Sequence, residues 1–246
     1  MGHEFEFGNE IAVDATPEQV WDAIATGPGV DSWFMGHTEV GSGEGGAVRT
    51  EFGGFPMTST VTAWEPPRRF AHDSGVAEDG RFIAYEFLIE GRAQGSTVLR
   101  LVTSGFLPGE DWEAEYDAMT RGIQLFVRTL AEYLIHFAGR TATPVTAFGP
   151  NVADWDRAWR SLAAALGLDR PAAEGDRVRC TLDGRPIDGV VYLVNPDAVG
   201  VRAGDGLYRF MRGLQGRVIA AHHLFADVEP QQTERAWVAW LDRVFA

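Results

Sequence analysis

Apolar and polar positions follow two different periods along the chain. Residues 111–138 carry apolar side chains at spacings of three and four, which is the period of an amphipathic helix. The segments before this helix show short alternating runs bounded by Gly, Pro or Asp, which are typical of strands. These runs predict strands at 4–15, 38–41, 46–53, 56–64, 68–75, 81–90 and 96–106. An antiparallel sheet packed against one long helix, an α+β arrangement, accounts for both periods.

A short helix is expected after the first strand. Thr16 suits the N-cap position and Pro17 suits the first helical position. We expect this helix to end at Gly27–Gly29, and a short helical turn to follow at 31–37.

Two adjacent prolines interrupt the strand pattern in the middle of this half. Pro66 and Pro67 cannot donate hydrogen bonds to a neighbouring strand, so strand pairing must stop there. The chain is expected to turn and to return as the next strand of a hairpin. On that strand Phe70 and His72 have the same parity, so they face the same side of the sheet.

The second half of the chain repeats this order of elements. Residues 139–151 read as a linker that contains a short strand, and residues 151–168 read as an amphipathic helix capped by Asn151. Strands are expected at 176–183, 187–194, 197–203, 206–212 and 216–225, followed by a helix at 231–245. The repetition predicts two tandem domains, at 1–140 and 145–246, of which the second is smaller and a degenerate copy of the first.

Three segments of the first half resemble the START/Bet v 1-like (SRPBCC) superfamily, in its activator-of-Hsp90-ATPase-like branch. They are "ATPEQVWDAIATGPGVDSWF" (15–34), "VTAWEPPRRFAH" (61–72) and "GIQLFVRTLAEYL" (122–134), and they occur in the family's order within residues 5–138. Ile123 departs from the pattern, because the family often has tryptophan there. The resemblance implies a helix-grip fold, in which a curved antiparallel sheet wraps a long C-terminal helix, often around a cavity for an apolar ligand. It further implies roles in lipid or polyketide binding, aromatase or cyclase catalysis, or co-chaperone contacts.

The composition narrows the range of partners. The formal net charge of −14 would repel nucleic acid and anionic membrane surfaces. No apolar run reaches the length of a membrane span, and the N-terminus lacks the regions of a signal peptide, so we expect a cytoplasmic location. The chain contains no lysine, which excludes Schiff-base chemistry through that residue. Its single cysteine, Cys180, excludes a disulfide framework within the chain.

Three motifs suggest specific chemistry but lack the context that this chemistry needs. "GSGEGG" (41–46) matches G-x-G-x-x-G, yet a strand rather than a helix is expected after it. The run "HDS" that begins at His72 contains the residue types of a hydrolase triad, but adjacent strand residues point to opposite faces. His222 and His223 face opposite sides for the same reason and have no recognisable third ligand. We therefore expect no nucleotide cofactor and no metal site.

The candidate ligand-binding residues are large or polar side chains that a helix-grip fold would place around its cavity. They are Trp33, Met35, His72, Tyr85, Trp112, Tyr116, Met119 and Ile123. The last four are spaced four, three and four, so they share one helix face. The alternative for this set is ordinary core packing, because Met and aromatic stripes usually belong to cores. Leu130 lies farther along the same face, where we expect the helix and the sheet to pack tightly.

Three functions are consistent with this pattern. The first is binding of a small apolar or aromatic molecule in the cavity of the N-terminal domain, without chemistry. The second is a cyclase or aromatase, which would need a poised acid or base. The side chains that could supply one are His37, Glu51, His72, Tyr85 and Tyr116. No pair among them has a diagnostic spacing, so no catalytic residue is assigned, and a polar pair inside the cavity would distinguish the two functions. The third is a protein-interaction role like that of the Hsp90 activators.

Overall fold

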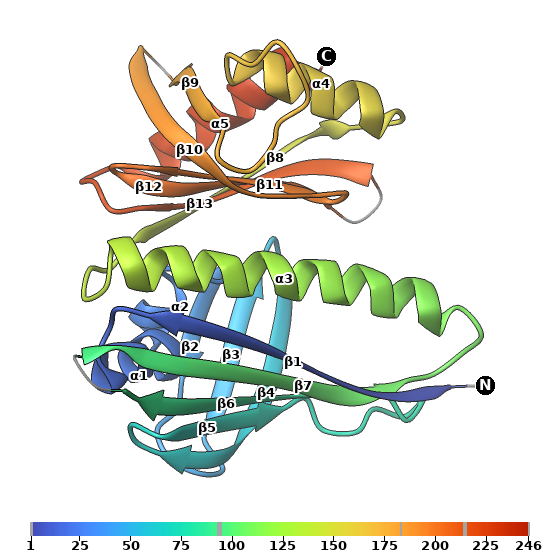
Figure 1. The fold of residues 1–246 in the computed structure, drawn as a ribbon. Coiled ribbons are helices and arrows are strands. Elements are labelled where there is room, and N and C mark those ends of the chain that lie inside the picture. Colours follow the sequence, from blue (N-terminus) through green and yellow to red (C-terminus); the bar gives the residue numbers. More distant parts are fainter. Residues whose placement is uncertain (1, 93–94, 183, 214–215, 246) are drawn as a thin grey trace. The chain divides into compact units, whose positions relative to one another are not determined.

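In the first half of the chain the alternating runs form a curved antiparallel sheet (Figure 1). The computed structural model describes residues 2–92, 95–182, 184–213 and 216–245, and it divides into two units, 1–141 and 142–246. The strands of the first unit are β1 (His3–Val13), β2 (His37–Val40), β3 (Ala47–Phe52), β4 (Phe55–Glu65), β5 (Arg69–Asp73), β6 (Phe82–Gly91) and β7 (Thr97–Leu107). Within the described residues their order is β1-β7-β6-β5-β4-β3-β2, and every neighbouring pair is antiparallel.

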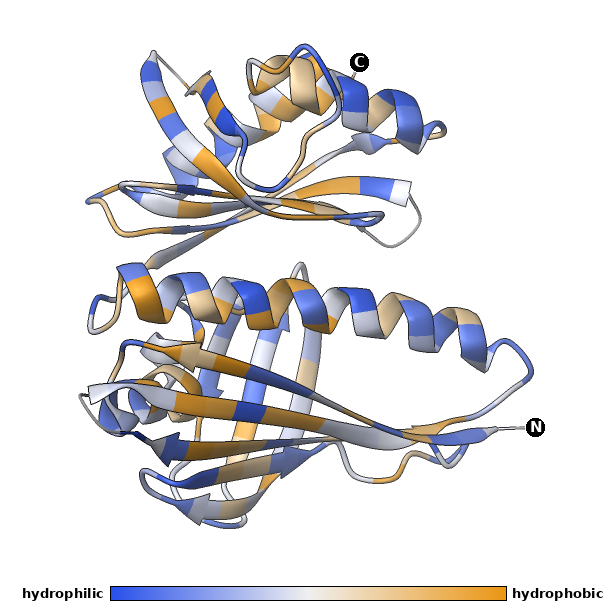
Figure 2. Cartoon of the chain, in the orientation of Figure 1, coloured by the Kyte–Doolittle hydropathy of each residue, from blue (hydrophilic) through white to orange (hydrophobic). Residues whose placement is uncertain are grey.

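The long helix α3 (Trp112–His136) lies along one face of this sheet (Figure 1). Ile123, Val127, Leu130 and Leu134 recur at spacings of three and four and are buried. Hydrophobic and hydrophilic residues alternate along the helix (Figure 2), as the sequence period predicts. We call the sheet face that packs toward this helix the inner face.

Two short helices connect β1 to β2. In α1 (Pro17–Ala25) the N-cap Thr16 and Gln19 form a reciprocal capping box. The helix ends at Ala25, close to the expected place, but a second helix, α2 (Gly27–Val30), begins there instead of a break. The cause is Thr26, whose hydroxyl oxygen accepts a hydrogen bond from the Gly29 N–H at 3.1 Å and so caps a new helix. The helical turn expected at 31–37 is found at its beginning, where the Trp33 and Phe34 N–H groups donate to the Val30 carbonyl oxygen, and it ends before His37, the first residue of β2.

The two prolines separate strands as expected. β4 ends at Glu65, directly before Pro66, and β5 begins at Arg69. The two strands pair antiparallel, with Glu65 opposite Arg69. The predicted hairpin is therefore confirmed.

The second unit has a similar plan. Its elements are β8 (Thr143–Asn151), α4 (Trp155–Ala165), β9 (Arg177–Leu182), β10 (Arg185–Asn195), β11 (Ala198–Ala203), β12 (Gly206–Arg212), β13 (Arg217–Leu224) and α5 (Pro230–Phe245). Two expectations are corrected here. The supposed linker is largely the nine-residue strand β8, which pairs with β13. The cap of α4 is Asp154 rather than Asn151, because the Asp154 carboxylate accepts a hydrogen bond from the Arg157 N–H at 2.9 Å.

Both sheets place the first strand of the unit beside its last strand. The order in the second unit is β8-β13-β12-β11-β10-β9 within the described residues, which repeats the order of the first unit with one strand fewer. In both units a long helix follows the last strand of the sheet. The predicted α+β fold of two tandem helix-grip units is confirmed.

Candidate ligand-binding site

Three polar side chains lie in one row across the inner face of the first sheet. His72 on β5 is directly opposite Tyr85 on β6, and Tyr85 is directly opposite Thr103 on β7. Residues opposite each other on neighbouring antiparallel strands point to the same face, so the three side chains project together. We refer to His72, Tyr85 and Thr103 as the polar row.

The polar row is surrounded by aromatic and aliphatic side chains. The His72 ring lies 5.3 Å from the Tyr85 ring and 5.5 Å from the ring of the buried Phe70, measured between ring centroids. Phe87 stands two residues after Tyr85 on the same face, and its ring is 6.5 Å from that of His72. Polar atoms in such surroundings lose their hydration and need partners from the protein or from a ligand.

Two buried atoms of the polar row lack such partners. His72 Nδ1 and Thr103 Oγ1 make no hydrogen bond to any described residue, although both atoms are inaccessible to solvent. Thr103 is fully buried. Leaving a buried donor or acceptor unpaired costs about 1–3 kcal/mol. In folded proteins almost all buried polar groups are paired.

The surroundings keep the polar row uncharged at neutral pH. Burial lowers the pKa of His72 to about 4, and the nearby Asp73 carboxylate opposes this effect only weakly. Burial also raises the pKa of the Tyr85 hydroxyl. The row therefore offers neutral hydrogen-bonding groups rather than ions.

A small enclosed cavity of about 10 Å³ lies between the inner face and α3. It is lined by Asn9, Ile11, Trp33, Phe87, Leu99, Leu101, Val127 and Leu130. Phe87 connects this cavity to the polar row, because Phe87 and Tyr85 share a face of β6. The cavity thus lies at Leu130, where the sequence led us to expect the tightest packing, and its volume is close to the minimum for one water molecule.

Trp33 is held in place by a hydrogen bond as well as by packing. Its indole N–H donates to the Ala23 carbonyl oxygen at 2.8 Å, and its side chain is buried. The neighbouring Phe34 packs on Phe126 of α3, with ring centroids 4.5 Å apart. Trp33 therefore forms a fixed wall of the cavity.

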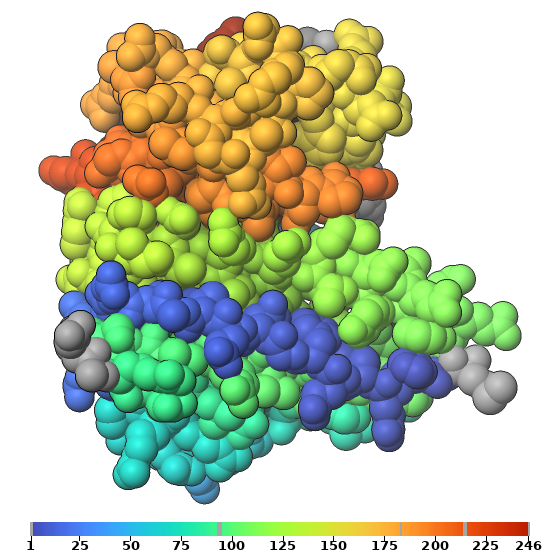
Figure 3. Space-filling view, viewed as in Figure 1, coloured from blue at the N-terminus to red at the C-terminus, as the bar shows by residue number. Residues whose placement is uncertain are grey.

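Trp112 and Tyr116 line a different hollow, at the beginning of α3. This open hollow of about 560 Å³ lies between β1 and the helix, which run side by side in Figure 3. The Trp112 ring stacks on the His3 ring at 4.0 Å, and Tyr116 contacts Phe5 at 5.7 Å between centroids. About 27 Å of helix separates Trp112 from Leu130, at 1.5 Å per residue. Of the residues proposed from the sequence, Trp33 thus lines the enclosed cavity, whereas Trp112 and Tyr116 line this open hollow.

Three further sequence candidates, Met35, Met119 and Ile123, are not among the lining residues of either hollow. Ile123 is buried, whereas Met35 and Met119 are half-buried. Two residues that the sequence reasoning missed are Thr103 and Asn9. The sequence signal for Thr103 is its position: it stands two and four residues after Leu101 and Leu99 on the predicted strand at 96–106, so the three side chains share one face.

The structure also bears on ions and membranes. Within the described ranges, no three His, Cys, Asp or Glu side chains gather as they would around a metal ion. No helix in the described part of the chain is both long and apolar enough to cross a membrane.

Comparisons with known proteins find one matching family and several solved structures with a similar fold. One family model, described as polyketide cyclase / dehydrase and lipid transport, matches residues 4–136. No curated protein matches. Among solved structures the chain is similar to DynU16, a protein of the dynemicin biosynthetic locus, at 20% identity and a TM-score of 0.46, covering 98% of this chain and 95% of that one.

Two further structures illustrate the range of similar proteins. The di-domain ARO/CYC protein BexL from the BE-7585A biosynthetic pathway is 12% identical with a TM-score of 0.45, covering 96% of this chain and 93% of BexL. Aha1 from Colwellia psychrerythraea, solved as a dimer, is 21% identical with a TM-score of 0.42, covering 53% of this chain and 96% of Aha1. The family match confirms the resemblance to the START/Bet v 1-like superfamily. The chain belongs to the family of polyketide cyclases, dehydrases and lipid transport proteins.

Proposed function

We propose that the first unit binds a small, uncharged, mainly apolar or aromatic molecule between the inner face of its sheet and α3. The observation that carries this proposal is the pair of buried, unpaired atoms His72 Nδ1 and Thr103 Oγ1. A ligand that supplies their missing partners removes a cost of about 1–3 kcal/mol for each atom.

The chemistry of the polar row selects the class of ligand. His72, Tyr85 and Thr103 offer neutral hydrogen-bonding groups, and Asn9 on the same face adds an amide. A hydroxyl or carbonyl group on an otherwise apolar ligand suits these partners. A carboxylate or an ammonium group does not, because a charge placed there would lose its hydration without an opposite charge.

Binding requires the first unit to open. The enclosed cavity of about 10 Å³ cannot hold an organic ligand. We propose that the first half of α3 moves, because its inward residues Tyr116 and Met119 are half-buried while Leu130 and Leu134 are buried. The ligand then selects an open state of the unit.

The cyclase alternative is less well supported by the same residues. A general base works best with a pKa near the working pH. The His72 pKa of about 4 makes this imidazole a weak base at neutral pH. We therefore favour ligand binding over cyclase catalysis, with the neutral His72 as a hydrogen-bond partner of the ligand.

A titration with 1-aminoanthracene, an uncharged aromatic fluorophore, tests the proposal. We expect binding to the full-length protein, and weaker binding by roughly tenfold in His72→Leu, since one hydrogen bond in an apolar site is worth about 1.5 kcal/mol. His136→Leu makes the same change at the exposed end of α3 and should leave the affinity unchanged. Equal affinities for all three proteins would contradict the proposed site.

A further inference from the structure

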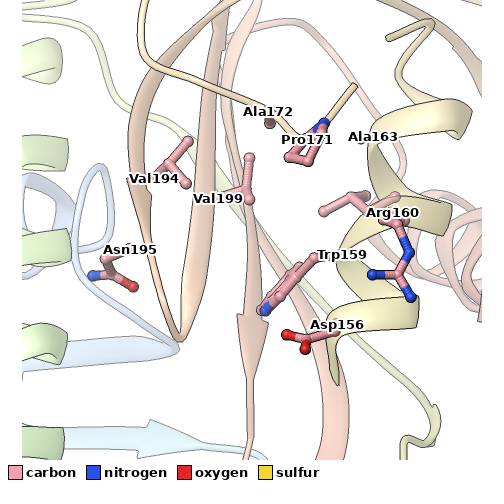
Figure 4. A pocket seen from close by; sticks show the side chains of 10 residues that line it. Asp156, Trp159, Arg160, Ala163, Pro171, Ala172, Val194, Asn195 and Val199 are labelled. Atoms are coloured by element: carbon pink, nitrogen blue, oxygen red, sulfur yellow. The ribbon is translucent and has the colours of Figure 1, made fainter. Parts of the chain in front are cut away.

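The second unit contains a hollow of its own, with a volume of about 260 Å³ (Figure 4). It lies between α4, the β10–β11 hairpin and the loop at residues 166–176, which we call the roof loop. Its lining residues are Asp156, Trp159, Arg160, Leu162, Ala163, Pro171, Ala172, Val194, Asn195 and Val199. All of them belong to the second unit, so the hollow is a property of that unit alone.

The interior of this hollow is apolar. Leu162, Ala163 and Val199 are buried, and they come from α4 and β11. Trp159 and Val194 line facing sides in Figure 4, with Pro171 and Ala172 above them. An open hollow with such walls favours ligands that present apolar surface to it.

The walls are fixed before any ligand arrives. The Trp159 indole N–H donates to the Pro196 carbonyl oxygen at 3.2 Å, which ties α4 to the β10–β11 turn. In the roof loop the Ala173 N–H donates to Asp176 Oδ2 at 2.8 Å, and Arg170 forms an ion pair with Asp176. The Gly175 N–H donates to the Val191 carbonyl oxygen at 2.8 Å. A preformed pocket saves a ligand the entropy cost of ordering it.

The rim of the pocket is polar and formally neutral. Asp156 and Arg160 are both exposed, carry opposite charges and stand four residues apart on α4, so they lie on the same side of the helix. Asn195 contributes an amide from the β10–β11 turn. The mouth therefore offers hydrogen bonds without a net charge, on a protein whose formal charge is −14.

This pocket is not the counterpart of the site in the first unit. In the second unit the space between the sheet and α5 is filled by Trp237 and Trp240, which are 0% and 5% exposed. Their rings pack on Phe210 with centroids 5.8 Å and 5.5 Å away. In the second unit, side chains therefore fill the space between the sheet and α5, and the hollow lies beside α4 instead.

We propose that the pocket beside α4 binds a small uncharged aromatic molecule of one or two rings, with a polar substituent at the rim. The ring lies against Trp159, Val194 and Val199, and the substituent reaches Asp156, Arg160 or Asn195. This inference is independent of the function proposed for the first unit.

NMR titration of the full-length protein with 4-methylphenol tests this site. The reporter is the indole N–H signal of Trp159, assigned by its loss in Trp159→Phe. We expect this signal to shift in a saturable manner with 4-methylphenol. The charged analogue 4-methylbenzoate should shift it less effectively, because the rim holds Asp156 as well as Arg160 and the formal net charge of −14 opposes the approach of an anion.

A pair of neighbouring substitutions supplies the control. Ala172→Phe places a ring in the pocket, whereas Ala173→Phe adds the same ring at the next, exposed residue that does not line it. We expect Ala172→Phe to abolish the shift and Ala173→Phe to preserve it. Should Ala172→Phe fail to fold, Val194→Trp fills the pocket from the opposite wall, at a position that is 36% exposed. An unmoved Trp159 signal, or equal shifts in the filled and control variants, would overturn the inference.

Discussion

The Nδ1 atom of His37 lies 2.6 Å from Oδ2 of the buried Asp31. The other oxygen of this carboxylate accepts a hydrogen bond from the Thr38 N–H, also at 2.6 Å. Asp31 is the C-cap residue of α2, and His37 begins β2. The pair therefore joins the two ends of the loop that carries Trp33, and Trp33 lines the enclosed cavity.

This pair predicts a pH-dependent contribution to stability. Burial raises the pKa of Asp31, and this effect exceeds the opposing hydrogen bonds from Thr38 and His37. The folded state therefore takes up a proton before the unfolded state does, so Asp31 adds stability as the pH falls through its raised pKa toward 3.8. Urea unfolding of the wild type and Asp31→Asn should show the wild type gaining relative stability over this range. A constant difference between the two proteins would contradict the assignment.

His72 predicts the opposite trend. The pKa of His72 is about 4 in the folded state and 6.5 ordinarily, the value we take for the unfolded chain. The neutral His72 therefore contributes fully to the free energy of unfolding above pH 6.5, and this contribution is lost as the pH falls toward 4. The loss amounts to at most about 3 kcal/mol, at roughly 1.4 kcal/mol per pKa unit. Urea unfolding at neutral pH and near pH 4 should show a smaller decrease for His72→Leu than for the wild type. Parallel decreases would show that the His72 ring is accessible to water.

The long helix predicts two different responses to truncation. Leu130 is 2% exposed and lines the enclosed cavity, so Leu130→Ala should lower the free energy of unfolding by about 2–5 kcal/mol. Met119 is half-buried, so Met119→Ala should cost less stability and should change the affinity for 1-aminoanthracene instead. Thermal melts and fluorescence titrations measure both effects. If Met119→Ala melts as early as Leu130→Ala and binds the probe normally, Met119 is ordinary core.

Much of the fold follows from sequence periodicity. The strands, α3 and the proline hairpin at Pro66 are predictable because alternation and turn residues are local signals. β8 was harder to recognise, because Pro144, Gly149 and Pro150 made this edge strand resemble a linker.

The site is less predictable than the fold. Parity assigns His72 to one face of its strand, but it does not say which strands are neighbours. The polar row depends on β5, β6 and β7 lying side by side in one register. From the sequence alone Thr103 is therefore an ordinary strand residue. The stacking of Trp112 on His3 is not predictable either, because it depends on which elements are neighbours in the fold.

The conservative substitution Thr103→Val tests the binding account most directly. Valine keeps the shape of threonine and removes the buried hydroxyl that has no partner among the described residues. The ligand-free protein should therefore become more stable, by about 1 kcal/mol or more. Thr38→Val is the matched control, because the Thr38 hydroxyl lies 2.9 Å from the Thr50 hydroxyl and its removal breaks a buried hydrogen bond.

The decisive measurement is the affinity of Thr103→Val for 1-aminoanthracene, taken together with its melting temperature. The account predicts a higher melting temperature and binding weaker by about three- to tenfold, the value of one hydrogen bond of about 0.7–1.4 kcal/mol. Thr38→Val should melt earlier and bind within about twofold of the wild type. If Thr103→Val melts earlier and binds the fluorophore as the wild type does, the Thr103 hydroxyl is a satisfied part of the core and the polar row is not a ligand site.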